Sequence, residues 1–364
     1  MLGWVTRFAR RPALLALACL LAVVCATLFA PSMSGDTASA AVAGTNPQKA
    51  GMAELMKSYD RSTGLIGKNW WQAAVALSTL ETFQEATGFA GYRGAISAAF
   101  AHHKSGRFEN AFNDDTGWWG LAWLQAYHMS GYKPYLVMAE TDADYIHQSW
   151  DETCGGGVWW STARKYKNAI ANELFLELTA WLHNAIPGDS KYLNWANSEW
   201  NWFSGSGMIN KSDVINDGLT AHCANNHENT WTYNQGVLLA GLAQLYKATG
   251  NRALLSRAEG IGQAAIRHLT IGGVLHEPCR GTQCGGNAGG DNQSFKGIFV
   301  QDLKVLAVTA RTNQFSGFFR TQARAIESHD TDGHHQLGMF WAGPNQGRTS
   351  YSQASAEAAL VAAL

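Results

Sequence analysis

The chain has 364 residues, with 27 Lys and Arg against 28 Asp and Glu and a formal net charge of -1. Only 15% of the residues are charged, and basic residues are not in excess, so the composition argues against a nucleic-acid-binding protein. Aromatic residues are frequent, with 15 Trp and 11 Tyr among them. We expect these rings both to fill a core and to line a groove for a neutral partner.

The N-terminus has the pattern of a secretory signal peptide. Three arginines at residues 7–11 precede an apolar run that ends at Ala30, and Ala-x-Ala cleavage patterns follow. We predict a signal peptide over residues 1–43, cleaved near residues 40–43, and a secreted, extracellular mature protein of residues 44–364 without a membrane anchor. An uncleaved signal anchor is the alternative, because the apolar run is near the length that spans a bilayer.

Apolar residues recur at helical spacing along the whole mature chain, and strand-like alternation is scarce. The predicted helices are 48–59, 70–87, 92–103, 116–130, 133–150, 168–186, 191–203, 230–249, 252–269, 294–309, 314–328 and 351–364. Glycine-rich breaks separate many of them. No linker rich in Pro, Ser or Gly is long enough to separate a second domain, so we predict one all-α domain over residues 44–364.

About twelve helices in one unbroken domain fit an antiparallel helical array. Six helical hairpins can close into an (α/α)6 toroid of inner and outer rings, in which the loops at one end face a common groove. The 230–249 segment suits the inner ring, because residues 237–243 are apolar nearly all round and small residues such as Gly236 and Gly241 allow close packing. An open helical solenoid is the alternative, although no repeated sequence motif supports it.

Two adjacent carboxylates, Asp114 and Asp115, precede an apolar helical run that begins with Trp118 and Trp119. Carboxyl groups held close together cannot ionise independently, because the second charge must form beside the first, so their pKa values split into those of an acid and a base. Glycoside hydrolysis needs this division, with one carboxylate at the anomeric carbon and one carboxylic acid to protonate the leaving oxygen. The alternative is that the pair only caps the helix.

Further clusters place polar side chains beside aromatic rings at predicted loop-to-helix junctions. The predicted substrate-binding residues are Asn113, Trp118, Trp119, Trp159, Asn168, Asn172, Tyr233, Asn234, Gln235, Asp291, Gln293, Phe295 and Lys296. The amides among them can donate to and accept from sugar hydroxyls. Structural roles are the alternative for some members, since Asn168 and Asn172 can bond to each other or cap a helix and Lys296 can pair with Asp291.

Four cysteines remain after the leader, an even number that favours two disulfides in an exported chain. Cys279 and Cys284 lie on one short loop and form the natural pair, which leaves Cys154 with Cys223. A zinc site built from Cys223 and the histidines near it is the competing interpretation, although exported thiols usually pair with one another. We expect no metal and no other cofactor, because the sequence has no zincin, P-loop or nucleophile-elbow pattern.

The clusters form a series of motifs in a fixed order along the chain. They are Asn113-Asp114-Asp115 with Trp118-Trp119, Gly155-Gly156-Gly157-x-Trp159, Tyr166-Lys167-Asn168, Thr232-Tyr233-Asn234-Gln235-Gly236 and Phe295-Lys296-Gly297-Ile298-Phe299. This series resembles glycoside hydrolase family 76, the bacterial endo-α-1,6-mannanases and their fungal cell-wall relatives, over nearly the whole mature chain. The resemblance implies an (α/α)6 toroid that acts on α-1,6-linked mannan with retention of configuration.

The resemblance assigns the paired aspartates to the catalytic roles, with Asp114 as nucleophile and Asp115 as general acid/base. Adjacency itself favours retention, since retaining enzymes hold their carboxyls about 5 Å apart and neighbouring Cα atoms are about 3.8 Å apart. The implied substrate is α-mannan or manno-oligosaccharides, cut at internal linkages by a monomer. Two other functions stay open, namely glycan transfer onto a cell-wall acceptor, as thought for the fungal branch, and carbohydrate binding without catalysis.

Overall fold

The computed structural model describes residues 46–278 and 290–364, which belong to one compact unit that begins at Gly44. The predicted signal peptide and the predicted Cys279–Cys284 pair lie outside these ranges. Within them, no helix combines the length and the apolar character needed to cross a membrane.

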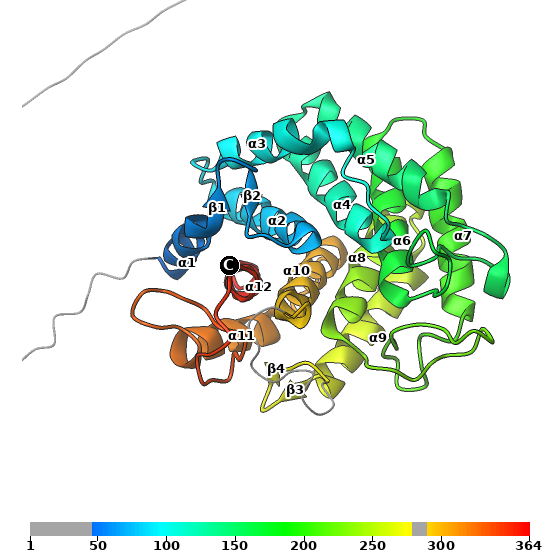
Figure 1. Ribbon diagram of the computed structural model, residues 1–364. Coiled ribbons are helices and arrows are strands. Elements are labelled where there is room, and N and C mark those ends of the chain that lie inside the picture. The colour runs from blue at the N-terminus through cyan, green and yellow to red at the C-terminus, as the bar shows by residue number, and fades with distance from the viewer. Residues whose placement is uncertain (1–45, 279–289) are drawn as a thin grey trace, which may run out of the picture. The chain divides into compact units, whose positions relative to one another are not determined.

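Twelve α-helices in the described ranges form two concentric sets (Figure 1). The inner helices are α2 (Trp70–Thr87), α4 (Asn113–Ser130), α6 (Ala169–Ala185), α8 (Thr232–Thr249), α10 (Asn292–Ala310) and α12 (Ser350–Ala362). The outer helices are α1 (Pro47–Leu55), α3 (Arg93–His103), α5 (Lys133–His147), α7 (Lys191–Gly205), α9 (Arg252–His268) and α11 (Ser316–His329). Each inner helix packs against the next, and α12 packs against α2. The ring is therefore closed, so the predicted (α/α)6 toroid is confirmed and the open solenoid is wrong.

Short elements connect the helices. Two antiparallel hairpins pair β1 (Tyr59–Asp60) with β2 (Leu65–Ile66) and β3 (Thr270–Ile271) with β4 (Val274–Leu275). The second hairpin turns at Gly272 and Gly273, which both have positive φ, as tight hairpin turns require. Three 3₁₀ turns complete the described elements, and they are η1 (Met56–Ser58), η2 (Lys104–Gly106) and η3 (Thr153–Gly155).

Two inner helices, α2 and α4, begin in different ways, because only α2 has a side-chain cap at its start. Helix α2 has the predicted bounds, since the Asn69 side chain accepts the N–H of Gln72 at its start and Gly88 ends it in the left-handed conformation. Helix α4 begins at Asn113, three residues before the predicted start at 116, and its N-cap position is Phe112, which makes no side-chain cap. Asp114 and Asp115 therefore lie inside the first turn, and the interpretation of the pair as an N-cap is wrong.

The tryptophans serve both purposes that their number predicted. Trp119 and Trp123 are fully buried, with ring centroids 5.5 Å apart, in a core cluster that also contains Phe108. A second cluster around α8, α10 and α12 holds the fully buried Trp341. Other tryptophans line the cleft described below.

Glycines allow the inner helices to approach closely. A Cβ added at Gly297 on α10 would lie 2.4 Å from the Cα and 2.5 Å from the carbonyl oxygen of Ser355 on α12. At Gly236 on α8, it would lie 2.6 Å from the Cα of Phe299 on α10. In both places the obstacle is backbone, which cannot rotate away as a flexible side chain can.

We expect Gly297→Ala to lower the free energy of unfolding by about 2 kcal/mol, because overpacking against backbone outweighs the gain in helix propensity of about 1 kcal/mol. Gly260→Ala is the matched control, since Gly260 lies inside α9 with nothing within 4 Å of an added Cβ. It should raise the same free energy by about 1 kcal/mol. Urea unfolding followed by circular dichroism measures both, and equal changes would contradict the close contact of α10 with α12.

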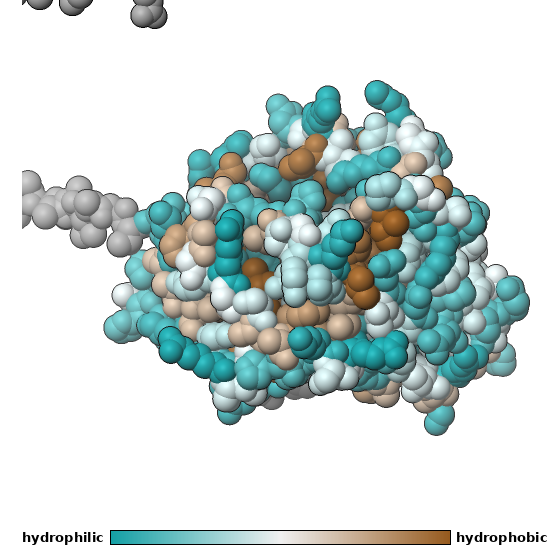
Figure 2. Space-filling view, turned by 90° about the horizontal axis from the view of Figure 1, so that it is seen from above, coloured by the Kyte–Doolittle hydropathy of each residue, from teal (hydrophilic) through white to brown (hydrophobic). Residues whose placement is uncertain are grey.

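Figure 2 shows one face of the protein, on which hydrophilic side chains dominate and hydrophobic ones form small, separate areas. Strongly exposed apolar side chains such as Val137, Ile271 and Val308 belong to three different elements, α5, β3 and α10. Single exposed apolar residues are normal on a surface that faces water.

Candidate active site

A cleft of about 390 Å³ opens at the N-terminal ends of the inner helices. Its walls come from the starts of α2, α4, α8 and α10 and from the loops before α6 and α8. The lining residues are Trp71, Phe112, Asp114, Asp115, Trp118, Trp160, Tyr166, Asn168, Asp217, Tyr233, Asp291 and Phe295. The cleft thus combines four carboxyl groups with a largely aromatic wall, as small-molecule sites commonly combine apolar surface with a few polar groups.

The two adjacent aspartates of α4 accept different hydrogen bonds. Asp114 accepts one from the indole N–H of Trp160, with 2.9 Å between Nε1 and Oδ2, and one at Oδ1 from the backbone N–H of Asp115 at 3.1 Å. Asp115 accepts one at Oδ2 from the side-chain amide of Asn110 at 2.6 Å. Each carboxyl group is therefore held by a donor from outside α4.

The surroundings raise the pKa of both carboxyl groups. Burial raises the pKa of Asp114 to about 7, and the charge of Asp115 adds to this effect while the Trp160 hydrogen bond opposes it. Burial also raises the pKa of Asp115 to about 6, against the hydrogen bond from Asn110 and with the help of the Asp291 charge. Between about pH 6 and 7 the pair therefore holds close to one proton, which provides one acid and one base.

Aromatic rings form the remaining wall in stacked pairs. Tyr233 on α8 stacks on Phe295 of α10 with ring centroids 3.8 Å apart, and Trp71 on α2 stacks on Trp118 of α4 at 5.9 Å. The indole N–H of Trp71 also donates to Asp291 at 3.2 Å. This last contact fixes a third carboxylate at the start of α10.

The fourth carboxylate, Asp217, comes from the loop before α8. It accepts a hydrogen bond from the Tyr166 hydroxyl at 2.5 Å, and Asn226 donates to that hydroxyl at 2.8 Å. Burial raises the pKa of Asp217, although the Tyr166 hydrogen bond opposes the shift and the Glu228 charge adds to it. No three or more His, Cys, Asp or Glu side chains in the described ranges are grouped so as to hold a metal ion.

Seven predicted site residues meet at this cleft, and they are Asp114, Asp115, Trp118, Asn168, Tyr233, Asp291 and Phe295. Five lining residues that the sequence prediction did not include are Trp71, Phe112, Trp160, Tyr166 and Asp217. Phe112 and Trp160 adjoin the predicted Asn113 and Trp159, and Tyr166 belongs to a quoted motif, so the motifs carried some of the signal. Trp71 lies within an ordinary apolar helix and Asp217 stands alone in an Asn-Asp-Gly turn, so only the fold identifies them.

Three predicted amides lie beneath the cleft wall and hold loops instead of facing the cavity. Asn113 donates from Nδ2 to the carbonyl of Trp159 at 2.6 Å. Asn172 bonds to both the N–H and the carbonyl of Val158, and it also donates to the Asn168 carbonyl. Gln235 bonds in the same two-sided way to Ile215. We revise their predicted role from sugar contact to support of the wall, because all three are fully buried and engaged.

Three other predicted site residues, Trp119, Trp159 and Asn234, also do not line the cleft. Trp119 belongs to the aromatic core, and the indole of Trp159 donates to Asp151 at 2.7 Å. Asn234 is fully buried, and neither atom of its amide has a partner within the described ranges.

Two more predicted ligands, both on α10, are engaged away from the cleft. Gln293 accepts a hydrogen bond from the Thr349 hydroxyl. Lys296 donates to the Met339 carbonyl at 2.6 Å and lies over the Trp341 ring, and these contacts take the place of the ion pair with Asp291 that was the structural alternative. We therefore revise the predicted sugar contact of both side chains to contacts within the fold.

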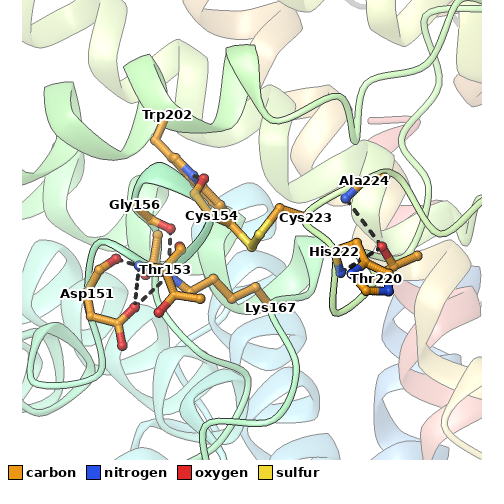
Figure 3. Close-up of a disulfide and its surroundings, with 11 residues drawn as sticks. Asp151, Thr153, Cys154, Gly156, Lys167, Trp202, Thr220, His222, Cys223 and Ala224 are labelled. Atoms are coloured by element: carbon orange, nitrogen blue, oxygen red, sulfur yellow. Dashed lines mark hydrogen bonds and ion pairs between the residues drawn. A yellow bond between two sulfur atoms is a disulfide. The ribbon is translucent and has the colours of Figure 1, made fainter.

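The predicted Cys154–Cys223 disulfide is present (Figure 3). It joins the loop before α6 to the loop before α8, and these loops supply Trp160 and Asp217 to the cleft. A zinc site at Cys223 is wrong, because this sulfur is bonded to another sulfur and is not a free thiolate.

A closed ring of helices, with paired and partly protonated carboxyl groups in a cleft at the inner N-terminal ends, defines a helical toroid with the arrangement that glycoside cleavage requires. The sequence pattern of glycosyl hydrolase family 76 matches residues 45–364. The chain belongs to this family.

Relatives in yeasts share this similarity in sequence. The chain is 28% identical over 314 residues to the mannan endo-1,6-alpha-mannosidase DCW1 of Saccharomyces cerevisiae. The aligned region covers 78% of this chain and 69% of that protein. The chain is 30% identical over 207 residues to the mannan endo-1,6-alpha-mannosidase DFG5 of Candida albicans, over 52% of this chain and 46% of that protein. The chain thus spans about half to two thirds of the length of these relatives.

Solved structures share the fold. The GH76A alpha-1,6-mannanase of Salegentibacter sp. HEL1_6 superposes with a TM-score of 0.78 at 24% identity, over 87% of this chain and 98% of that one. An inactive variant of the same mannanase, with alanine in place of two consecutive aspartates, was solved with alpha-1,6-mannotetrose and has the same TM-score at 23% identity, over 87% and 97%. Dfg5 of Chaetomium thermophilum, in complex with glucosamine, has a TM-score of 0.76 at 22% identity, over 87% and 88%.

Proposed function

We propose that the protein is an endo-acting α-1,6-mannanase that cleaves mannan with retention of configuration through Asp114 and Asp115. The observation that carries this proposal is the pair of adjacent carboxyl groups in one cleft, which together hold close to one proton between about pH 6 and 7. Two further facts support it. The yeast relatives are named mannan endo-1,6-alpha-mannosidases, and the Salegentibacter variant that lacks two consecutive aspartates is inactive.

In the first step, a carboxylate oxygen of Asp114 attacks the anomeric carbon as the bond from that carbon to the glycosidic oxygen breaks. Asp115 gives its proton to the departing oxygen, which leaves a mannosyl ester on Asp114. In the second step, Asp115 takes a proton from water while the water oxygen attacks the anomeric carbon and displaces Asp114. Two displacements on the same carbon restore its original configuration.

Two properties of the pair favour opposite divisions of the roles. The order of the pKa values, about 7 for Asp114 and about 6 for Asp115, places the shared proton on Asp114. The two N–H donors to the Asp114 carboxylate oppose this order, because such bonds favour the ionised form and fix its orientation, although burial outweighs them in the pKa. We propose Asp114 as the nucleophile on the basis of these fixed donors.

The test uses protein collected from the medium of cells that express the whole chain. We also propose that the protein is exported with residues 1–43 removed, and the N-terminal sequence of the collected protein tests this. The protein is incubated with linear α-1,6-mannan, branched yeast mannan and α-1,2-mannan, and reducing ends are counted. We expect the highest rate on the linear α-1,6-polymer and, by NMR, α-anomers as the first products. Activity on α-1,2-mannan alone, or β-anomers as first products, would contradict the linkage or the retention.

The same experiment separates two other functions. Transfer replaces water by a sugar hydroxyl in the second step, so an added acceptor oligosaccharide would give longer products at the expense of reducing ends. A carbohydrate-binding protein would bind the linear polymer and release no reducing ends from any substrate.

A further inference from the structure

The loop of residues 151–160, here called the tryptophan loop, wraps around a buried ammonium group. Nζ of Lys167 donates to Oδ1 of Asp151 at 3.0 Å and to the carbonyls of Asp151, Thr153, Gly156 and Gly157 at 2.6–3.1 Å. Figure 3 shows the lysine reaching toward Asp151, Thr153 and Gly156. The lysine side chain is 1% exposed, and a buried charge of this kind is tolerated only when it is fully bonded. Lys167 therefore fixes the shape of the loop.

The far end of the tryptophan loop is fixed against the start of α4. Asn113 donates from its side chain to the Trp159 carbonyl at 2.6 Å and from its backbone N–H to the Trp160 carbonyl at 2.8 Å. The N–H of Trp160 donates to the carbonyl of Tyr166 at 2.8 Å. Because Asn113 immediately precedes Asp114, these bonds set the position of Trp160 relative to that carboxylate.

We propose that Trp160 is a positioning residue for Asp114, and that Lys167 acts on Asp114 through Trp160 by holding the tryptophan loop. The indole N–H and the N–H of Asp115 bind one oxygen each of the Asp114 carboxylate, so they fix its orientation. The effect of Trp160 on catalysis rests on the function proposed above. Its effect on the protonation of Asp114 does not, and it can be measured without substrate.

Several elements bring titratable groups near Asp114. They are Asp115 on the same turn, Tyr233 on α8, Asp291 before α10, and Tyr166 and Asp217 on the loops before α6 and α8. All of these groups are acidic or phenolic, so none supplies a positive charge that would favour an ionised Asp114. The neutral indole donor opposes them, and its removal is expected to raise the pKa of Asp114 above about 7.

The first experiment replaces Trp160 by phenylalanine, which keeps an aromatic ring and removes the N–H. The wild type should have its highest kcat/KM between about pH 6 and 7. In Trp160→Phe the alkaline limb near pH 7, which Asp114 sets, should move to higher pH by about one unit, the scale of one hydrogen bond to a charged group. The maximum should fall, with kcat reduced more than KM is changed, because a higher pKa of Asp114 leaves less of the pair with Asp114 ionised and Asp115 protonated. NMR titration of the ¹³C-labelled Asp114 carboxyl should also move to higher pH. Trp195→Phe is the matched control, since Trp195 of α7 stacks on His147 of α5 and does not line the cleft.

The second experiment asks whether Lys167 acts through Trp160. Lys167→Met should shift the Asp114 titration in the same direction, whereas Lys165→Met, at an exposed lysine two residues away, should not. Added to Trp160→Phe, Lys167→Met should give no further shift, because a residue that acts through another shows no additive effect once the other is gone. If Lys167→Met does not fold, Asp151→Asn weakens the same contact and should give a smaller shift.

An unchanged Asp114 titration in Trp160→Phe would overturn the proposal. Fully additive shifts in the double variant would also overturn it, because they would show that Lys167 does not act through Trp160. A wild type that cleaves no mannan but shows the titration shifts would overturn the proposed function and leave the positioning role standing. If the loop had only a structural role, the variants would lose stability or activity at every pH, and the limb of the profile that Asp114 sets would not move.

Discussion

Asp114→Asn and Asp115→Asn are each expected to lower kcat/KM on linear α-1,6-mannan by about a thousandfold or more, because each removes one of the two groups to which we assign the reaction. Asparagine keeps the shape of the side chain and can neither attack the anomeric carbon effectively nor exchange a proton. The measurement is the release of reducing ends across the pH range. Near-normal turnover in either variant would show that the chemistry lies elsewhere.

The two variants should differ in how they can be rescued. In Asp114→Asn, azide can take the place of the missing nucleophile and should give a mannosyl azide of inverted configuration. In Asp115→Asn, an aryl leaving group that needs no proton should restore the first step, and azide should then give the retained product. If these outcomes are exchanged between the variants, the roles are reversed, as the order of the pKa values alone suggests.

Stability separates loss of chemistry from loss of folding. A carboxyl group whose pKa is higher in the folded state than in the unfolded state lowers the free energy of unfolding once the pH rises above the unfolded-state pKa. The loss is complete above the folded-state pKa. Above about pH 7, neither asparagine variant should therefore unfold more easily than the wild type. Asp144→Asn is the matched control for activity, since Asp144 makes a surface ion pair with Lys191 on the outer ring.

Removal of the Cys154–Cys223 disulfide is expected to lower the free energy of unfolding by about 4 kcal/mol. The bond joins positions 69 residues apart, so it restricts the unfolded chain over a long loop. The double variant Cys154→Ser/Cys223→Ser avoids a free thiol, and urea unfolding at neutral pH measures the change. The loss matters for the site as well, because the two joined loops carry Trp160 and Asp217.

The slope of the urea transition provides the control for this expectation. If the unfolded state keeps structure without the bond, the slope changes and the loss of free energy is smaller. A loss below about 1 kcal/mol with an unchanged slope would contradict the entropic argument.

The fold could be predicted in detail because its signals are local. Helix α2 has its predicted bounds since Asn69 and Gly88 mark its two ends in the sequence. The start of α4 was misplaced because Asp114 looked like a capping residue, whereas the structure uses Phe112 without a side-chain cap. The two hairpins have strands of two residues each, which is too short for an alternating pattern to appear.

The site could be predicted only where polar and aromatic residues are neighbours in sequence. Asp114, Tyr233 and Phe295 meet this condition, and they line the cleft. Asn172 and Gln235 meet it too, yet they face inward to loop backbone, since the depth of a side chain depends on tertiary packing. Asp217 was missed for the opposite reason, because its partner Tyr166 is 51 residues away.

Closure of the ring by α12 has a consequence for the order of folding. The Tyr351 hydroxyl accepts hydrogen bonds from the N–H groups of Lys68 and Asn69, and Gln353 donates to the Gly51 carbonyl, so the closing contacts join residues 282–302 positions apart. Contacts at such separation form slowly, since a long loop must close first. Helix α12 packs against α2 and α10, which carry walls of the cleft. With the ring open, the α2 and α10 walls of the cleft lose their packing against α12, so the cleft that holds Asp114 is incomplete. Catalytic competence is then one of the last properties that a folding chain acquires.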